Sequence, residues 1–114
     1  MADLEFHGQL EAITMIAQLA MRAVDGPFLR INLHATREGE RYHVDAVYRS
    51  NEFDGDRKFE YPDQIPMIFE KLSRIHRDKE LRLFERCRMS IAAEHQVAAD
   101  YDFGEGFLEG VSVT

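Results

Sequence analysis

Apolar and polar residues alternate over two segments near the end of the chain, and this alternation predicts a β-hairpin. The apolar positions of one parity are Cys87, Met89, Ile91, Ala93, Val97, Ala99, Tyr101 and Phe103. A period of two residues is typical of strands that bury one face and expose the other. We therefore expect two antiparallel strands joined by a short loop.

The register of this hairpin follows from keeping its apolar residues on one face. Pairing Ala93 with Val97 does so and leaves a three-residue loop of residues 94–96, because a shift by one residue would mix the two faces. Such a loop needs a residue in the left-handed region, which His95 enters more readily than most residue types. On the polar face this register places Ser90 opposite Asp100 and Arg88 opposite Asp102.

Two further alternating segments, Phe28 to Ala35 and Tyr42 to Arg49, predict an earlier hairpin. Like faces stay together if the loop has an even length, most simply the four residues 37–40. This loop pairs Leu33 with Val44 and His34 with His43. Turn-forming residues follow from 51 to 57, and the segment 58–61 is expected to form a short edge strand.

Apolar residues at spacings of three and four predict two amphipathic helices. The first runs from about Glu5 to Val24 and ends at Asp25, Gly26 and Pro27. The second has Asp63 as its N-cap and Pro66 in its first turn, and it ends near Leu81.

The predicted order of elements is α-β-β-(β)-α-β-β. Two helices with one apolar stripe each, and a sheet with one apolar face, bury these surfaces by stacking in two layers. We therefore expect an α+β two-layer sandwich: an antiparallel sheet of four to five strands with both helices on one face. The opposite, polar face of the sheet would then remain uncovered by its own chain.

With 114 residues, of which 45% are hydrophobic and 31% charged, the chain has the size and composition of a single globular domain, 1–114. Its tail, about 104–114, is weakly patterned, which leaves open whether it is flexible or packs on the core or on a neighbour. No apolar run approaches the roughly 20 residues of a membrane span, and the first residues lack the pattern of a signal peptide. We therefore expect a cytoplasmic protein without membrane contact.

The formal net charge of −7 argues against direct binding of nucleic acid, which requires a basic surface. An acidic chain is suited to a basic protein partner, whose approach it would accelerate. Acidity also keeps many cytosolic proteins soluble, so charge alone does not choose between these explanations.

A search for catalytic or metal-binding residues yields only weak candidates. His34 and His43, with Asp45 nearby, are possible ligands, but zinc normally takes three or four, so we expect neither metal nor cofactor. The single Cys87 lies on the apolar parity, which favours an inert thiol. Arginine opposite Asp102 favours a paired carboxylate over a general base. A binding protein is thus favoured over an enzyme.

The run ERCRMSIAAEHQVAADYDF, residues 85–103, resembles the C-terminal strand pair of the YezG-like bacterial immunity proteins. That pair ends in an acidic and aromatic motif of the Asp-Tyr-Asp-Tyr type, which here is Asp100, Tyr101, Asp102 and Phe103. The order of helices and hairpins also resembles that of the family. The chain differs in having His95 where the family tends to have glycine, and Phe84 where it tends to have tryptophan.

This resemblance implies an immunity protein, an antitoxin that neutralises a cognate secreted toxin of the nuclease class by stoichiometric occlusion. Exposed carboxylates would stand in for substrate phosphates against a basic cleft. The candidate partner-binding residues are Asp45, Glu52, Asp54, Asp56, Asp100 and Asp102. The alternatives are a small ligand- or metal-binding protein that uses His34 and His43, and a homo-oligomeric structural module.

Overall fold

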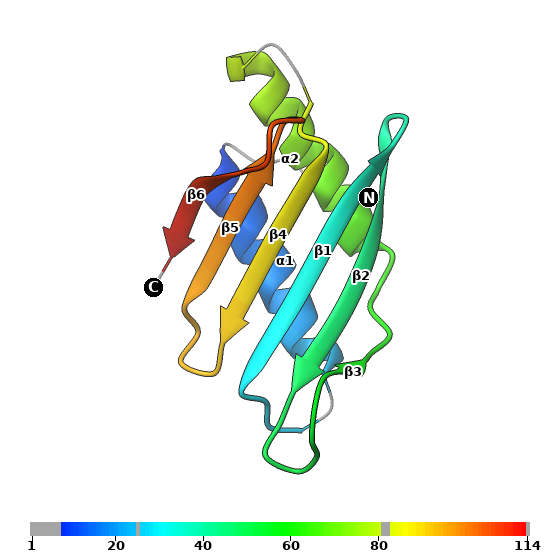
Figure 1. Cartoon of the computed structure of the whole chain (residues 1–114), viewed down its shortest axis with the longest axis vertical. Helices are drawn as coiled ribbons and strands as arrows, with labels where there is room; N and C mark the ends of the chain where they lie inside the picture. The colour runs from blue at the N-terminus through cyan, green and yellow to red at the C-terminus, as the bar shows by residue number, and fades with distance from the viewer. Residues whose placement is uncertain (1–7, 25, 81–82, 114) are drawn as a thin grey trace, which may run out of the picture.

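The structure is a computed structural model that describes residues 8–24, 26–80 and 83–113, and Figure 1 shows two helices behind one sheet. The elements are α1 (Gln9–Ala23), β1 (Arg30–Glu38), β2 (Arg41–Arg49), β3 (Arg57–Lys58), α2 (Gln64–Glu80), β4 (Arg86–Ala92), β5 (Val97–Asp102) and β6 (Phe107–Val113). All neighbouring strands pair antiparallel, in the spatial order β3-β2-β1-β4-β5-β6.

The core lies between the helices and one face of the sheet. Fully buried side chains come from α1 (Ile13, Ile16), β1 (Ile31, Leu33), α2 (Ile65, Ile68, Phe69, Leu72) and β4 (Met89, Ile91). Burial of one such aliphatic or aromatic side chain contributes roughly 1.5–3 kcal/mol. These positions belong to the apolar stripes of the sequence. The periodicity that predicts the helices and strands therefore also identifies the residues that pack in the core.

The residues around the helix ends explain where α1 stops and where α2 begins. Helix α1 ends at Ala23 because Val24 is extended, with ψ of 121°, and Gly26 then adopts a positive φ of 98°. Helix α2 begins one residue after Asp63 and holds Pro66 in its first turn, where the missing N–H has no intrahelical partner to lose. Asp25 and Leu81, expected at two helix ends, lie outside the described residues. Within the described chain, neither helix combines the length and the apolar character that crossing a membrane requires.

The predicted fold class is confirmed: an α+β sandwich with an antiparallel sheet and both helices on one face. The strand β6 extends the sheet beyond the predicted hairpins, because part of the weakly patterned tail pairs with β5. The edge strand expected at residues 58–61 is shorter than predicted and begins one residue earlier, at Arg57.

The register predicted for the first hairpin is wrong by two residues. Leu33 pairs with Ala46 instead of Val44, and His34 pairs with Asp45 instead of His43. The loop is therefore only Gly39 and Glu40, since Glu38 already pairs with Arg41. Gly39 has a φ of 71°, as the first residue of a type II′ hairpin turn requires.

The second hairpin differs from its prediction in the same way. Val97 pairs with Ile91 instead of Ala93. The loop still has three residues, because Ala92 and Gln96 are joined by a backbone hydrogen bond of 2.9 Å, but it covers residues 93–95. His95 adopts the expected left-handed conformation, with a φ of 68°. Arg88 consequently faces Asp100, and Arg86 faces Asp102.

Candidate functional site

The face of the sheet that turns away from both helices is the candidate functional surface, and it faces the viewer in Figure 1. We call it the open face. Side chains of alternate residues in the paired strands project from it: Arg30, Asn32, His34 and Thr36 of β1, Arg41, His43, Asp45, Val47 and Arg49 of β2, Arg86, Arg88 and Ser90 of β4, and Ala98, Asp100 and Asp102 of β5. The face is thus rich in arginine although the chain is acidic.

The two candidate histidines share the open face but are not cross-strand partners. His34 lies opposite Asp45, while His43 lies opposite Thr36. The Nε2 atom of His43 is 3.4 Å from the Asp45 carboxylate, and both side chains are more than half exposed. No group of three or more histidine, cysteine or carboxylate side chains with metal-binding geometry occurs in residues 8–24, 26–80 and 83–113.

The two aspartates of the predicted acidic motif are both bound to arginine. Arg88 donates a hydrogen bond of 3.1 Å to Asp100, and both groups remain partly exposed. Asp102 is only 3% exposed and accepts hydrogen bonds from Nε and Nη2 of Arg86. Its other oxygen accepts the backbone N–H groups of Gly104 and Gly106 at 2.8 and 2.9 Å.

These bonds change the expected role of Asp102. The N–H group of Gly104 and the guanidinium of Arg86 hold the pKa of the Asp102 carboxyl below its usual value. The carboxylate is therefore charged at neutral pH, but burial withdraws it from the surface, so it is not available as the partner contact that the sequence suggested. It orders the turn between β5 and β6 instead.

The remaining candidate carboxylates lie away from Asp100 and Asp102. Asp45 is on β2, and the other three are in the loop that follows β2. Glu52, Asp54 and Asp56 are exposed in the loop between β2 and β3. Asp56 accepts a hydrogen bond of 3.2 Å from Nε of Arg49. The six predicted acidic residues therefore do not form one patch. Glu52, Asp54 and Asp56 lie together in this loop, where Asp56 is paired with Arg49 and the other two form no ion pair with the described residues.

Phe107, at the start of β6, lies on the open face and forms a cluster that sequence reasoning missed. Its ring stacks against the guanidinium groups of Arg88, at 4.2 Å, and Arg86, at 4.7 Å. The ring of His34 contacts it edge-on, with 5.9 Å between ring centroids. We call Phe107, Arg86, Arg88 and His34 the Phe107 cluster. The signal in the sequence was weak because Phe107 reaches this face only through the irregular pairing of β5 with β6.

Ionisable groups in the core are held in their neutral forms. Burial raises the pKa of the Cys87 thiol, which is completely buried on β4. Burial also raises the pKa of Tyr42 to about 12, and its hydroxyl donates a 2.6 Å hydrogen bond to the carbonyl oxygen of Phe84. A thiol in this position is a poor nucleophile, since the reactive species is the thiolate.

A comparison with protein-family models and with curated proteins finds no match for this chain. The resemblance of residues 85–103 to the YezG-like immunity proteins therefore stays a prediction.

Proposed function

We propose that this protein is an immunity protein, which binds a cognate secreted toxin of the nuclease class and neutralises it by occlusion at equimolar ratio. The observation that carries the proposal is the open face, because residues 8–24, 26–80 and 83–113 form a two-layer core and leave one side of the sheet without a covering layer. The composition of this face supports a protein partner. Arginine and aromatic residues are enriched in protein interfaces and among the residues that dominate their affinity.

The Phe107 cluster is the part of the open face best prepared for contact. Stacking on Phe107 and pairing with Asp100 and Asp102 hold Arg88 and Arg86 in defined positions before a partner arrives. Side chains ordered in this way lose less conformational entropy on binding. A partner that covers the cluster would thus bind more tightly, because the arginine side chains are already ordered before binding.

The exposed loop between β2 and β3 supports a partner with a basic surface. Glu52 and Asp54 carry negative charge without forming an ion pair with the described residues, and the whole chain has a net charge of −7. Such charges accelerate association with a cationic nuclease domain, whose cleft must attract phosphates. Acting in the cytoplasm, the protein would protect the cell that makes the toxin before the toxin is exported.

The proposal predicts that a toxin gene lies beside the gene of this protein, and the toxin domain encoded there is the partner for the test. The purified chain should abolish the nuclease activity at a one-to-one molar ratio, and Phe107→Ala should weaken binding by roughly tenfold or more, as removal of an aromatic hot spot does. Thr36→Ala, a small change on the same face, should leave inhibition unchanged. Undiminished nuclease activity at several-fold excess of the chain would reject an immunity role.

A further inference from the structure

The two edges of the sheet differ in how they are protected. Figure 1 shows β3 as the outermost strand on one side and β6 on the other. An outermost strand carries a row of unpaired backbone N–H and C=O groups. These groups pair readily with another chain unless the edge is short, charged or covered.

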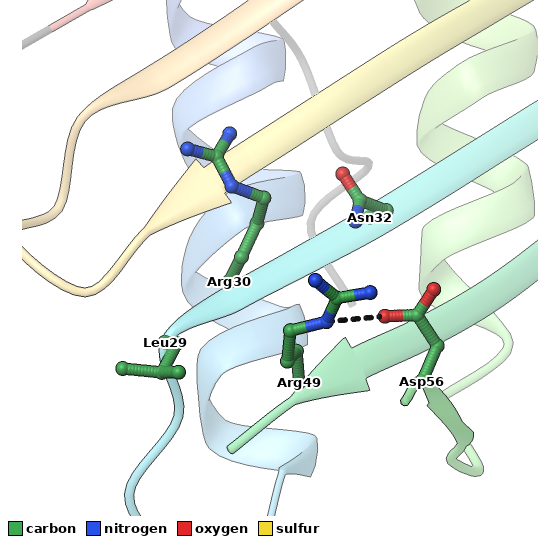
Figure 2. Close-up of a pocket in the computed structure, with 5 residues that line it drawn as sticks. All are labelled: Leu29, Arg30, Asn32, Arg49 and Asp56. Carbon is green, nitrogen blue, oxygen red and sulfur yellow. Dashed lines mark hydrogen bonds and ion pairs between the residues drawn. The ribbon is translucent and has the colours of Figure 1, made fainter. Parts of the chain in front are cut away.

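The edge at β3 is short, charged and covered. The strand consists of two residues, and both are charged and exposed. Beyond β3 the chain stays beside β2: the N–H of Phe59 donates to the carbonyl oxygen of Ala46 at 3.4 Å, and the Tyr61 hydroxyl donates to that of Val44 at 2.7 Å. Figure 2 shows that the loop before β3 is also tied to the end of β2, through the ion pair of Asp56. This edge is therefore closed to a further strand.

The edge at β6 has none of these three protections. The strand runs over seven residues, FLEGVSV, which include no lysine, arginine or proline. Phenylalanine and valine, which recur in it, are residue types enriched in strands. It pairs with β5 on one side, and residues 8–24, 26–80 and 83–113 supply no strand on its other side. A long edge of this kind is a site for strand pairing.

An irregularity in β6 narrows the choice of partner. On β5, only Asp100 separates Ala99 from Tyr101. On β6, two residues separate their partners, Val111 and Leu108. The strand thus has one extra residue, as in a β-bulge, which disturbs pairing with a regular strand. A second copy of β6 carries the same irregularity at the same position, so it matches this edge where a regular strand does not.

Two copies of β6 have a register in which they complement each other. A twofold axis at the extra residue pairs Phe107 with Ser112 of the copy and Leu108 with Val111 of the copy. Phe107 and Ser112 are partners of open-face positions of β5, whereas Leu108 and Val111 are partners of its core positions, so like faces stay together. A shift by one residue mixes the faces, and in one direction it also places Glu109 opposite Glu109 of the copy, where like charges repel.

Charge near β6 permits this pairing although each chain has a net charge of −7. On the neighbouring strand β5, Asp100 is paired with Arg88 and Asp102 with Arg86. The exposed acidic loop between β2 and β3 lies at the opposite edge of the sheet. Repulsion between two copies therefore acts mainly over long distances, where salt screens it.

We propose that β6 is a dimerisation edge, at which two copies of this chain pair their β6 strands antiparallel and join their sheets into one. Twofold symmetry of this kind is the commonest arrangement of homo-oligomers. The axis is perpendicular to the sheet, so the open faces of both copies, with their Phe107 clusters, lie on the same side. The inference rests on the edge of the sheet and does not depend on an immunity function.

Sedimentation velocity of the full chain, from about 1 to 500 µM, measures self-association. One pair of strands makes a small interface, so we expect a dissociation constant on the order of 10–100 µM. The dimer should become tighter as salt rises to about 0.3 M, because salt screens the repulsion between two acidic chains. A chain that stays monomeric over this whole range would overturn the proposal.

A lysine substitution locates the interface. Ser112 is exposed on β6, and lysine is a residue with which natural sheets block their edges, so Ser112→Lys should raise the dissociation constant about tenfold or more. Thr14→Lys, exposed on α1, makes the same chemical and charge change away from the edge and should dimerise normally. The dispersion of amide NMR signals checks that both variants fold. Equal dimerisation of the two would overturn the assignment to β6.

Cysteine variants test the register through a gain of signal. Phe107→Cys and Ser112→Cys chains, mixed in the presence of oxidised glutathione, should form a disulfide between copies, because the two positions are opposite each other. Neither variant alone should cross-link, and the native Cys87 is buried. A dimer without the mixed disulfide, or cross-linking of Ser112→Cys with itself, would overturn this pairing.

The same variants separate self-pairing from addition of a toxin strand. If the chain stays monomeric and Ser112→Lys weakens binding of the toxin, the edge serves the toxin and the proposal is overturned. If the chain dimerises through β6 but inhibits no toxin, the dimer stands and the immunity function fails.

Discussion

The Asp102 carboxylate uses both of its oxygens to order the turn between β5 and β6. One oxygen accepts the N–H groups of Gly104 and Gly106, which have φ values of 110° and 97°, and the other pairs with Arg86. Backbone N–H groups that converge in a turn often bind external anions. Here the chain supplies the anion itself, so the two glycines serve the fold and are not a phosphate site.

The lowered pKa of Asp102 predicts a specific loss of stability in acid. A carboxyl whose pKa is lower in the folded state than its ordinary value, about 4, stabilises the protein above that value. This contribution is lost as the pH falls below about 4 and through the folded pKa. Asp102→Asn keeps an oxygen that can accept the glycine N–H groups but carries no charge.

We therefore expect Asp102→Asn to be less stable than the unmodified chain at pH 7 and to approach it as the pH falls below about 4. Urea unfolding between about pH 2 and 7 measures the free energy of unfolding of both proteins. The matched control is Asp54→Asn, which should change the pH dependence little because Asp54 is exposed in a loop. A constant difference between the Asp102→Asn variant and the unmodified chain at all pH values would contradict this explanation.

The loop between β4 and β5 is strained at a single residue. His95 has a φ of 68°, and among the described residues it is the non-glycine position with positive φ. A side chain in the left-handed region costs roughly 1–2 kcal/mol, whereas glycine at the same position costs about 0.4–1 kcal/mol through greater freedom of the unfolded chain. The conformational penalty of histidine is the larger of the two.

We predict that His95→Gly raises the free energy of unfolding by about 0.8 kcal/mol, the difference between the central values of these two effects. Glu94→Gly in the same loop should lower it by about 0.4–1 kcal/mol, because Glu94 gains no relief from strain. Both residues are exposed, so neither change disturbs the core. Thermal and urea unfolding measure the two variants, and a loss of stability in both would show that His95 makes a favourable contact in the folded state.

The alternation of residues determined the faces of the strands but not their alignment. A shift of two residues leaves every side chain on the same face, so the pattern that buries Leu33 and Met89 is satisfied by more than one register. The loops decide between these registers. In the first hairpin, Gly39 at the first position of a two-residue loop was the available signal, since only this position needs a positive φ.

The alignment of the strands in turn determines which polar side chains meet. The correct register brings Arg30 opposite Arg49 and separates His34 from His43. The Phe107 cluster depends on β6, whose sequence is weakly patterned and whose pairing with β5 is irregular. The fold class therefore followed from periodicity, whereas both surface features needed contacts between residues far apart in the chain.

Charge is unevenly distributed over the molecule. Arginines dominate the open face, while Glu52 and Asp54 occupy the loop at the end where β2 leaves the sheet. An interface with charge of both signs discriminates between partners and fixes the orientation of the complex. The loop would contact basic residues of a nuclease, and the arginines of the open face would contact its acidic groups.

This arrangement predicts that the position of charge, beyond its total, controls the rate of association with the toxin. Replacing Glu52 and Asp54 by lysine should slow association by roughly tenfold at low salt, because steering acts where the charges meet the partner. Replacing Glu11, exposed on α1 behind the sheet, and Glu40, exposed in the turn between β1 and β2, by lysine gives the same change in net charge and should slow association only about two- to threefold. Stopped-flow association measured from low to physiological salt compares the two pairs, and the difference should shrink as salt screens the charges. If both pairs of substitutions slow association equally, the overall charge of the chain explains the steering. The loop would then not be a contact for the toxin.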